Sequence, residues 1–205
     1  MVDTIPGPDG KPRCRWCEAA PEFFTYHDNE WGFPVDDDYR LFEKICLESF
    51  QSGLSWRTIL AKRENFRVAF HQFDFDKIAR FTQRDINRLL KDEGIVRHRG
   101  KIEATINNAK RALEMVDQEG SLAAFFWRYE PDQKQLGAPQ SVSTSTESVA
   151  LSKELKKRGW KFVGPTTVFA FMQAMGLVND HVAACVTRTK VERARKKFTR
   201  PQSKD

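Results

Sequence analysis

The strongest constraint on this fold is the repeated pairing of a helix-capping residue with apolar side chains at helical spacing. One such segment begins at Asp36-Asp37-Asp38, and apolar residues then recur one turn apart at Leu41, Phe42, Ile45 and Cys46. Similar patterns predict helices over 56–70, 82–94, 102–120, 144–159 and 165–175. Alternation of apolar and polar residues is never sustained, so strand signals are scarce. The sequence therefore predicts an all-α fold.

Length and composition favour one globular unit with two less ordered ends. The chain has 205 residues, of which 40% are hydrophobic, and this is enough to bury a core. Pro6, Pro8, Gly10 and Pro12 predict a flexible N-terminal arm over residues 1–12. We expect a single domain over 13–187, followed by a basic C-terminal stretch over 188–205 that is either a frayed helix or a tail.

Net charge, hydropathy and cysteine content indicate which classes of binding partner and which cellular compartment to expect. The net charge of +6 favours a polyanionic partner such as nucleic acid, without requiring one. No apolar run approaches the roughly 20 residues that span a bilayer, and the N-terminus has no signal-peptide pattern. Four cysteines are too few for a disulfide scaffold in a chain of this length. We expect a cytoplasmic protein with no membrane association.

Cysteine and histidine residues near the two ends of the chain are candidate metal ligands. Cys14 and Cys17 have the C-x-x-C spacing that suits zinc, but a complete site needs two more ligands. His181 and Cys185 are four residues apart, so they would share one face if this segment is helical. Spacing alone permits a site made of Cys14, Cys17, His181 and Cys185, with His27 left out.

Glu48 is the carboxylate most suggestive of a binding site. It falls at the edge of the buried face of the helix that carries Leu41 and Ile45, where an unpaired carboxylate is costly. A partly exposed helix-end Glu is the ordinary interpretation. The nearby Phe50, Gln51 and Trp56 instead favour a cationic ligand. Gly53 should end this helix, and Ser55 can cap the next one.

A glycine-bounded segment between two helices is a candidate nucleic-acid contact. It extends from Gly94 to Gly100 and carries Arg97 and Arg99, with Lys101 directly after it. Backbone amides at the start of the second helix could receive a DNA phosphate. An ordinary αα-hairpin with solvated arginines is the alternative.

These motifs together resemble those of the DNA-3-methyladenine glycosylase I family, monofunctional base-excision repair enzymes of the helix-hairpin-helix superfamily. The matching motifs occur in unbroken order from about residue 13 to about residue 187. They are Arg13-Cys14-Arg15-Trp16, Tyr26-His27-Asp28-Asn29-Glu30-Trp31-Gly32, Ile45-Cys46-Leu47-Glu48, Ser52-Gly53-Leu54-Ser55-Trp56, Lys62-Arg63-Glu64-Asn65-Phe66, Gly94-Ile95, Arg97-His98-Arg99-Gly100-Lys101-Ile102, Leu155-Lys156-Lys157-Arg158-Gly159, Lys161-Phe162-Val163-Gly164 and Asn179-Asp180-His181-Val182.

The resemblance implies a monomeric enzyme that removes the cationic base 3-methyladenine from double-stranded DNA containing alkylated bases. It also implies the helix-hairpin-helix glycosylase fold, with a structural zinc site that joins the N- and C-terminal segments. The implied zinc ligands are Cys14, His27, His181 and Cys185. Cys17 would then be a nearby spare thiol.

The resemblance further implies a role for each residue of the site. Glu48 would be the catalytic residue, and the base would contact Tyr26, Trp56, Phe23 and Trp16. Several family members have Tyr where this chain has Phe23, so one phenol hydroxyl is missing. DNA contacts would come from Gly53, Leu54, Arg97, Arg99, Gly100 and Lys101. The Gly53-Leu54 turn would fill the gap left by the flipped nucleotide.

Two other functions compete with this one. A zinc-stapled module that binds alkylated DNA without catalysis would retain the pocket but release no base. A catalytic zinc hydrolase is disfavoured, because four protein ligands leave no position for an activated water. No lysine matches the nucleophile of the bifunctional superfamily members, so strand cleavage is not expected.

Overall fold

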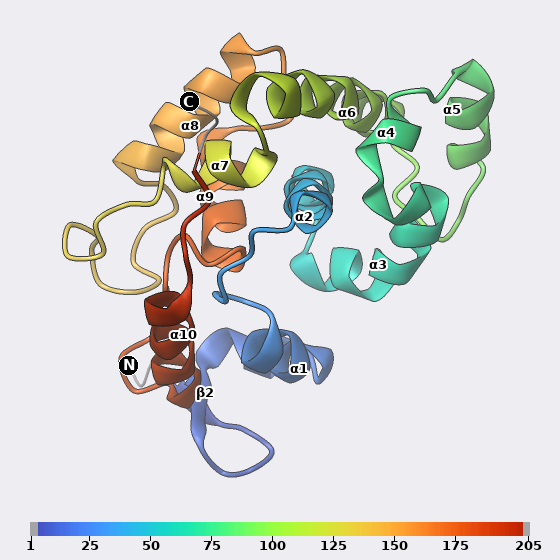
Figure 1. Ribbon diagram of the computed structural model, residues 1–205. Coiled ribbons are helices and arrows are strands. Elements are labelled where there is room, and N and C mark those ends of the chain that lie inside the picture. Colours follow the sequence, from blue (N-terminus) through green and yellow to red (C-terminus); the bar gives the residue numbers. More distant parts are fainter. Residues whose placement is uncertain (1–3, 203–205) are drawn as a thin grey trace.

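The computed structural model describes residues 4–202, and helices dominate that range (Figure 1). The α-helices are α1 Glu22–Asn29, α2 Asp38–Gln51, α3 Trp56–Ala69, α4 Phe75–Ile78, α5 Gln83–Leu89, α6 Arg99–Glu119, α7 Leu122–Trp127, α8 Thr146–Lys157, α9 Pro165–Ala174 and α10 Val186–Lys197. Two 3-10 helices, η1 Arg15–Ala19 and η2 His71–Phe73, and two short strands, β1 Thr4–Pro6 and β2 Pro12–Cys14, complete the fold. The predicted all-α class is confirmed, with this small hairpin added.

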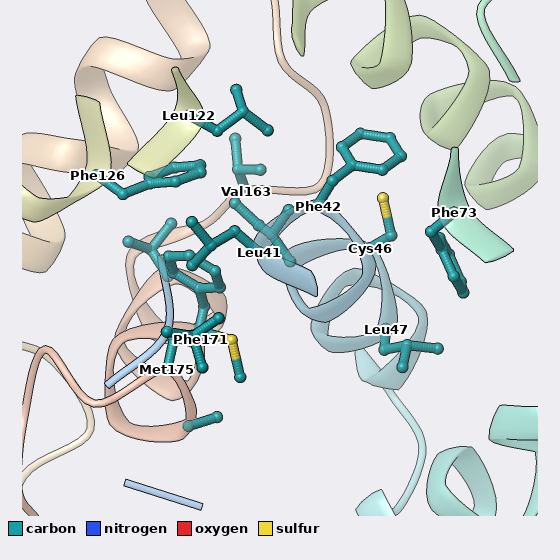
Figure 2. Packing of buried hydrophobic residues seen from close by; sticks show 14 of the residues in the cluster. Leu41, Phe42, Cys46, Leu47, Phe73, Leu122, Phe126, Val163, Phe171 and Met175 are labelled. Carbon is teal, nitrogen blue, oxygen red and sulfur yellow. The ribbon is translucent and has the colours of Figure 1, made fainter. Parts of the chain in front are cut away.

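Helix α2 is the centre of the molecule. Figure 1 shows it surrounded by α3, α6, α7 and α9, all of which contact it. Leu41 and Phe42 are fully buried, and Figure 2 shows Leu41 close to Phe126 and Phe171. Cys46 and Leu47 lie on the side of α2 that faces η2. A helix buried on this many faces is fixed in position, so its last turn is a rigid base for the site.

The predicted helix boundaries follow their capping residues. Asp37 accepts a hydrogen bond from the amide of Arg40 at the start of α2, and Ser55 does the same for Thr58 at the start of α3. Helix α9 has Pro165 in its first turn, where no amide donor is needed. Helix α5 ends five residues before Gly94, because 90–98 form an irregular connection to α6.

The N-terminal arm differs from its prediction. Residues 4–14 form an antiparallel hairpin in which Thr4 pairs with Cys14 and Pro6 with Pro12. Gly10, with φ +74°, provides the turn. The buried Arg13 anchors the second strand through hydrogen bonds of 2.7 and 2.9 Å to the Asp28 carboxylate. The expected flexible conformation is therefore wrong for 4–12, while residues 1–3 lie outside the described part of the chain.

The basic C-terminal stretch is helical. Helix α10 extends to Lys197, and Arg195 forms an ion pair with Glu130. The ring of Phe198 packs on Trp127 with centroids 4.4 Å apart. Of the two conformations left open by the sequence, the helix is therefore the observed one as far as Lys197. Residues 203–205 of the predicted tail lie outside the described range.

Candidate active site

A cavity of about 320 Å³ brings together the residues predicted to hold the base. Trp16 comes from η1, Phe23 and Tyr26 from α1, Glu48 from the end of α2, and Trp56 from the start of α3. The other half of the lining consists of Trp31, Gln51, Gln140, Ala170 and Gln173, of which only Gln51 was singled out from the sequence. Trp31 lies within the Tyr26–Gly32 motif, so it could have been included. Gln140 and Gln173 come from distant segments that carry no local signal.

The aromatic walls are packed against one another at inclined angles. The ring centroids of Trp16 and Phe23 are 5.6 Å apart, and those of Tyr26 and Trp56 are 5.3 Å apart. Aromatic faces at such spacings attract a flat, electron-poor ring by stacking and a cation through their π electrons. This cavity therefore suits a planar, cationic heterocycle.

Glu48 is paired with a lysine that sequence analysis did not identify. Lys44 lies one turn earlier on α2, and its ammonium is 2.8 Å from Oε1 of Glu48. The same ammonium donates a 2.7 Å hydrogen bond to the hydroxyl of Tyr26 and lies 3.4 Å from the ring centroid of Trp56. Burial lowers the pKa of Lys44 and raises the pKa of Tyr26. The i, i+4 spacing of Lys44 and Glu48 could have revealed this pair.

A second ion pair joins Glu30, directly after α1, to Arg63. Arg63 of α3 holds both carboxylate oxygens of Glu30, at 2.5 and 3.0 Å. Burial raises the pKa of Glu30, but the hydrogen bonds and charge of Arg63 outweigh that effect and leave it below its ordinary value. Glu48, which lines the cavity, and Glu30, which does not, therefore each have a cationic partner.

The turn after α2 projects an apolar side chain beside the cavity. Gly53 has φ +79°, a conformation that glycine adopts without strain, and Leu54 is 42% exposed. A hollow lined by Gly53, Leu54, Thr166 and Thr167 shares Glu48, Gln51 and Ala170 with the aromatic cavity. Leu54 is thus adjacent to the cavity.

The predicted DNA contacts Arg97, Arg99 and Gly100 lie at or just before the start of α6. Arg97 and Arg99 are exposed and form loose ion pairs, at 3.4 Å with Glu93 and 3.3 Å with Glu103. Gly100 lies in the first turn of α6, where an added Cβ would come within 3.3 Å of the His98 ring.

Lys101 was predicted to contact DNA, but its side chain does not lie on the surface. Its side chain is buried, and its ammonium donates hydrogen bonds to the carbonyl oxygens of Phe50 (2.8 Å) and Ser52 (2.5 Å). The Lys101 ammonium points inward because the carbonyl oxygens at the C-terminal end of α2 have no amide donor within their own helix. It therefore supports the Gly53-Leu54 turn from inside the protein.

Four buried side chains could hold a metal ion. Cys14, His27, His181 and Cys185 place one ligand atom each within 4.8 Å of the others. Cys17 does not belong to this group, which favours the set containing His27 over the one permitted by spacing alone. His181 and Cys185 lie in the connection between α9 and α10, so the helical geometry expected for them is wrong. A turn, closed by the amide of Cys185 donating to Val182, brings them together instead.

Each histidine of this cluster is oriented by a hydrogen bond to one ring nitrogen, which leaves its other ring nitrogen facing the cluster. Nδ1 of His27 is bonded to Asp28 at 2.7 Å, and Nε2 of His181 is bonded to the carbonyl oxygen of Trp31 at 3.0 Å. The remaining nitrogens, Nε2 of His27 and Nδ1 of His181, face each other at 3.0 Å. Hydrogen bonds from Cys14 and the two histidines hold the pKa of Cys185 far below its usual range. These contacts are typical of a metal centre with an ordered outer shell.

Within residues 4–202, no helix has the length and apolar character needed to cross a membrane.

Comparison with known proteins agrees with this geometry. The family model described as methyladenine glycosylase matches residues 16–189. DNA-3-methyladenine glycosylase 1 of Escherichia coli (strain K12) is 51% identical over 177 residues, which cover 84% of this chain and 95% of that protein.

Solved structures show the same fold. A crystal structure of 3-methyladenine DNA glycosylase I superposes with a TM-score of 0.80 at 49% identity, over 85% of this chain and 98% of the other. A variant of 3-methyladenine DNA glycosylase I, crystallised in complex with 3-methyladenine, gives a TM-score of 0.80 at 37% identity, over 86% of this chain and 97% of the other. The predicted resemblance is confirmed, and the chain belongs to the methyladenine glycosylase family.

Proposed function

We propose that this protein is a monofunctional DNA glycosylase that flips 3-methyladenine out of double-stranded alkylated DNA and hydrolyses its N-glycosidic bond. The observation that carries the proposal is the aromatic cavity with Glu48 at its edge and the exposed Leu54 beside it. A flipped base would enter the cavity while Leu54 fills the space that it leaves in the duplex. Arg97, Arg99 and the amides around Gly100 would hold nearby phosphates.

The chemistry requires little acid catalysis. An adenine methylated at N3 carries a positive charge, and when the bond from N9 to C1′ breaks, the bonding electrons neutralise the departing base. A water molecule then adds to the cationic sugar at C1′ and loses a proton. Tyr26, Trp56, Phe23 and Trp16 would bind the base. Glu48 would orient it and stabilise the developing positive charge on the sugar.

The metal cluster would have a structural role. Two thiolates and two imidazoles are the donors that zinc prefers in tetrahedral structural sites. Bound zinc would join the N-terminal hairpin to the α9–α10 connection, with no open position for a reacting water. We also propose a single domain over 13–187 that acts as a monomer in the cytoplasm.

The test is release of free 3-methyladenine from methylated duplex DNA by the purified protein. We expect release by the native protein and a decrease of at least about tenfold in Glu48→Gln, corresponding to about 1.4 kcal/mol of transition-state stabilisation. A folded, zinc-loaded protein that binds methylated DNA but releases no base would contradict the proposal and support the non-catalytic binding module.

A further inference from the structure

We propose that Lys44 is a specificity-determining residue of the base pocket, because its ammonium contacts Glu48, Tyr26 and Trp56, the groups that would attract a cationic base. The pocket would then prefer cationic over neutral alkylated bases only weakly. This inference deepens the proposed function and rests on it.

The ion pair, hydrogen bond and ring contacts of the Lys44 ammonium are made with groups expected to receive the cationic base. The ammonium lies 2.8 Å from the Glu48 carboxylate and 2.7 Å from the hydroxyl of Tyr26. It is also 3.4 Å from the ring centroid of Trp56, well within the distance at which a cation is attracted to an aromatic face. A carboxylate, a phenol oxygen and an indole face therefore already surround a cation that belongs to the protein.

Lys44 lies behind the cavity rather than inside it. It is 5% exposed, and it is not among the residues that line the cavity, whereas its three partners are. A base can therefore enter without displacing the lysine. Because the amine is enclosed by these partners, it is also poorly placed to reach the sugar, which remains at the mouth of the cavity.

The two carboxylates Glu48 and Glu30 are both balanced by cations. Lys44 neutralises Glu48, and Arg63 neutralises Glu30. An incoming cation would be attracted by Glu48 and repelled by Lys44, and because their charged groups are only 2.8 Å apart, the repulsion offsets much of the attraction. A neutral base of the same shape experiences neither effect. Selection would then depend mainly on shape and stacking, and only weakly on charge.

The experiment compares two free ligands of similar shape: the 3,9-dimethyladeninium ion, which is permanently cationic, and 3-methyladenine at a pH where it is neutral. Their dissociation constants are measured with the native protein and with Lys44→Met, which removes the charge and keeps the length. For the native protein we expect the two constants to agree within about threefold. In Lys44→Met we expect the preference for the cation to increase by at least about tenfold.

Two further variants isolate the cause. The double variant Lys44→Met/Glu48→Gln should return the ligand preference to nearly the native value, because it removes both charges. Lys91→Met, at an exposed position outside the cavity, should leave the preference unchanged. Thermal unfolding establishes that each variant is folded.

Three results would overturn the inference. One is a native preference for the cation above about thirtyfold, which needs no variant to measure. Another is an unchanged ligand preference in folded Lys44→Met. The third is borohydride trapping of abasic DNA by the native protein but not by Lys44→Met, which would show that the amine leaves its position to attack the sugar. Release of 3-methyladenine by the native protein tests the proposed function separately from all three.

Discussion

The ammonium of Lys101 lies 2.5 Å from the carbonyl oxygen of Ser52, so the first turn of α6 is bonded directly to the turn that presents Leu54. A second bond, to the carbonyl oxygen of Phe50, fixes the same lysine to the last turn of α2. The segment expected to hold DNA phosphates and the side chain expected to enter the duplex are thus coupled through one buried cation.

Replacing Lys101 with Met should impair the insertion of Leu54 without altering the base pocket. We expect excision of 3-methyladenine to slow by about tenfold and the free energy of unfolding to decrease by about 1–3 kcal/mol, since two carbonyls lose their donor. Affinity for the free base should not change. Single-turnover kinetics and calorimetry measure these quantities, with Lys91→Met as the matched control. Native excision rates in Lys101→Met would contradict the coupling.

Truncating Leu54 should slow base excision without lowering the stability of the protein. Leu54 is 42% exposed, so Leu54→Ala should change the melting temperature little but slow base excision by about tenfold, because the flipped nucleotide is no longer replaced in the stack. Val68→Ala, at a 75% exposed position on α3, is the control and should retain both properties. Equal excision by the two variants would show that Leu54 does not enter the duplex.

Metal analysis should find one zinc ion per chain, bound by the cluster that contains Cys14. Cys14→Ser should lose the metal and at least about 3 kcal/mol of stability, because the hairpin is no longer joined to the C-terminal segment. Chelation should lower the melting temperature of the native protein in the same way. Cys17→Ser should keep its zinc, and loss of metal from that variant would restore the alternative ligand set.

Lowering the pH should weaken the Glu30–Arg63 ion pair and reduce its contribution to stability. The pKa of Glu30 in the folded protein is below its ordinary value of 4.5, so its contribution to stability is complete above that pH and is lost as the pH falls through the lowered pKa. Glu30→Gln should cost about 1 kcal/mol at pH 7, and the difference should shrink below pH 4.5.

The matched control for this prediction is Glu64→Gln. Glu64 pairs with Arg67 on the same helix, but its side chain is 76% exposed, so we expect a change below about 0.5 kcal/mol. Urea unfolding at several pH values provides the comparison. A difference for Glu30→Gln that stays constant down to pH 3 would exclude the linkage.

The helices were predictable because their signals are local. Capping residues such as Asp37 and Ser55 lie within one turn of the amides that they accept from, so sequence proximity alone identifies them. The N-terminal hairpin was not predictable in this way. Its prolines and Gly10 resemble those of a flexible arm, and its order depends on Arg13 meeting Asp28, a residue on a different element.

The sequence predicted which residues meet in the cavity better than it predicted the charges around them. The motif that contains Glu48 indicated a pocket for a cation, and the aromatic residues assigned to that pocket do meet in one cavity. The partner of Glu48 was overlooked because Lys44, in a helix of mixed polarity, resembles an ordinary solvated residue. Lys101 was misassigned for the related reason that sequence gives no direction to a long, flexible side chain.

The metal cluster has a consequence for synthesis of the chain. Its ligands lie far apart in the sequence, with Cys14 in the N-terminal hairpin and His181 and Cys185 between α9 and α10, so it cannot form until Cys185 has been synthesised. Trp16 and Tyr26, which wall the base pocket, lie next to the early ligands. A polypeptide that ends before His181 would contain Glu48 and Leu54, but the segments that carry Trp16 and Tyr26 would lack the contacts that the cluster provides. The four side chains therefore meet only after the segments that carry Glu48 and Leu54 have been synthesised.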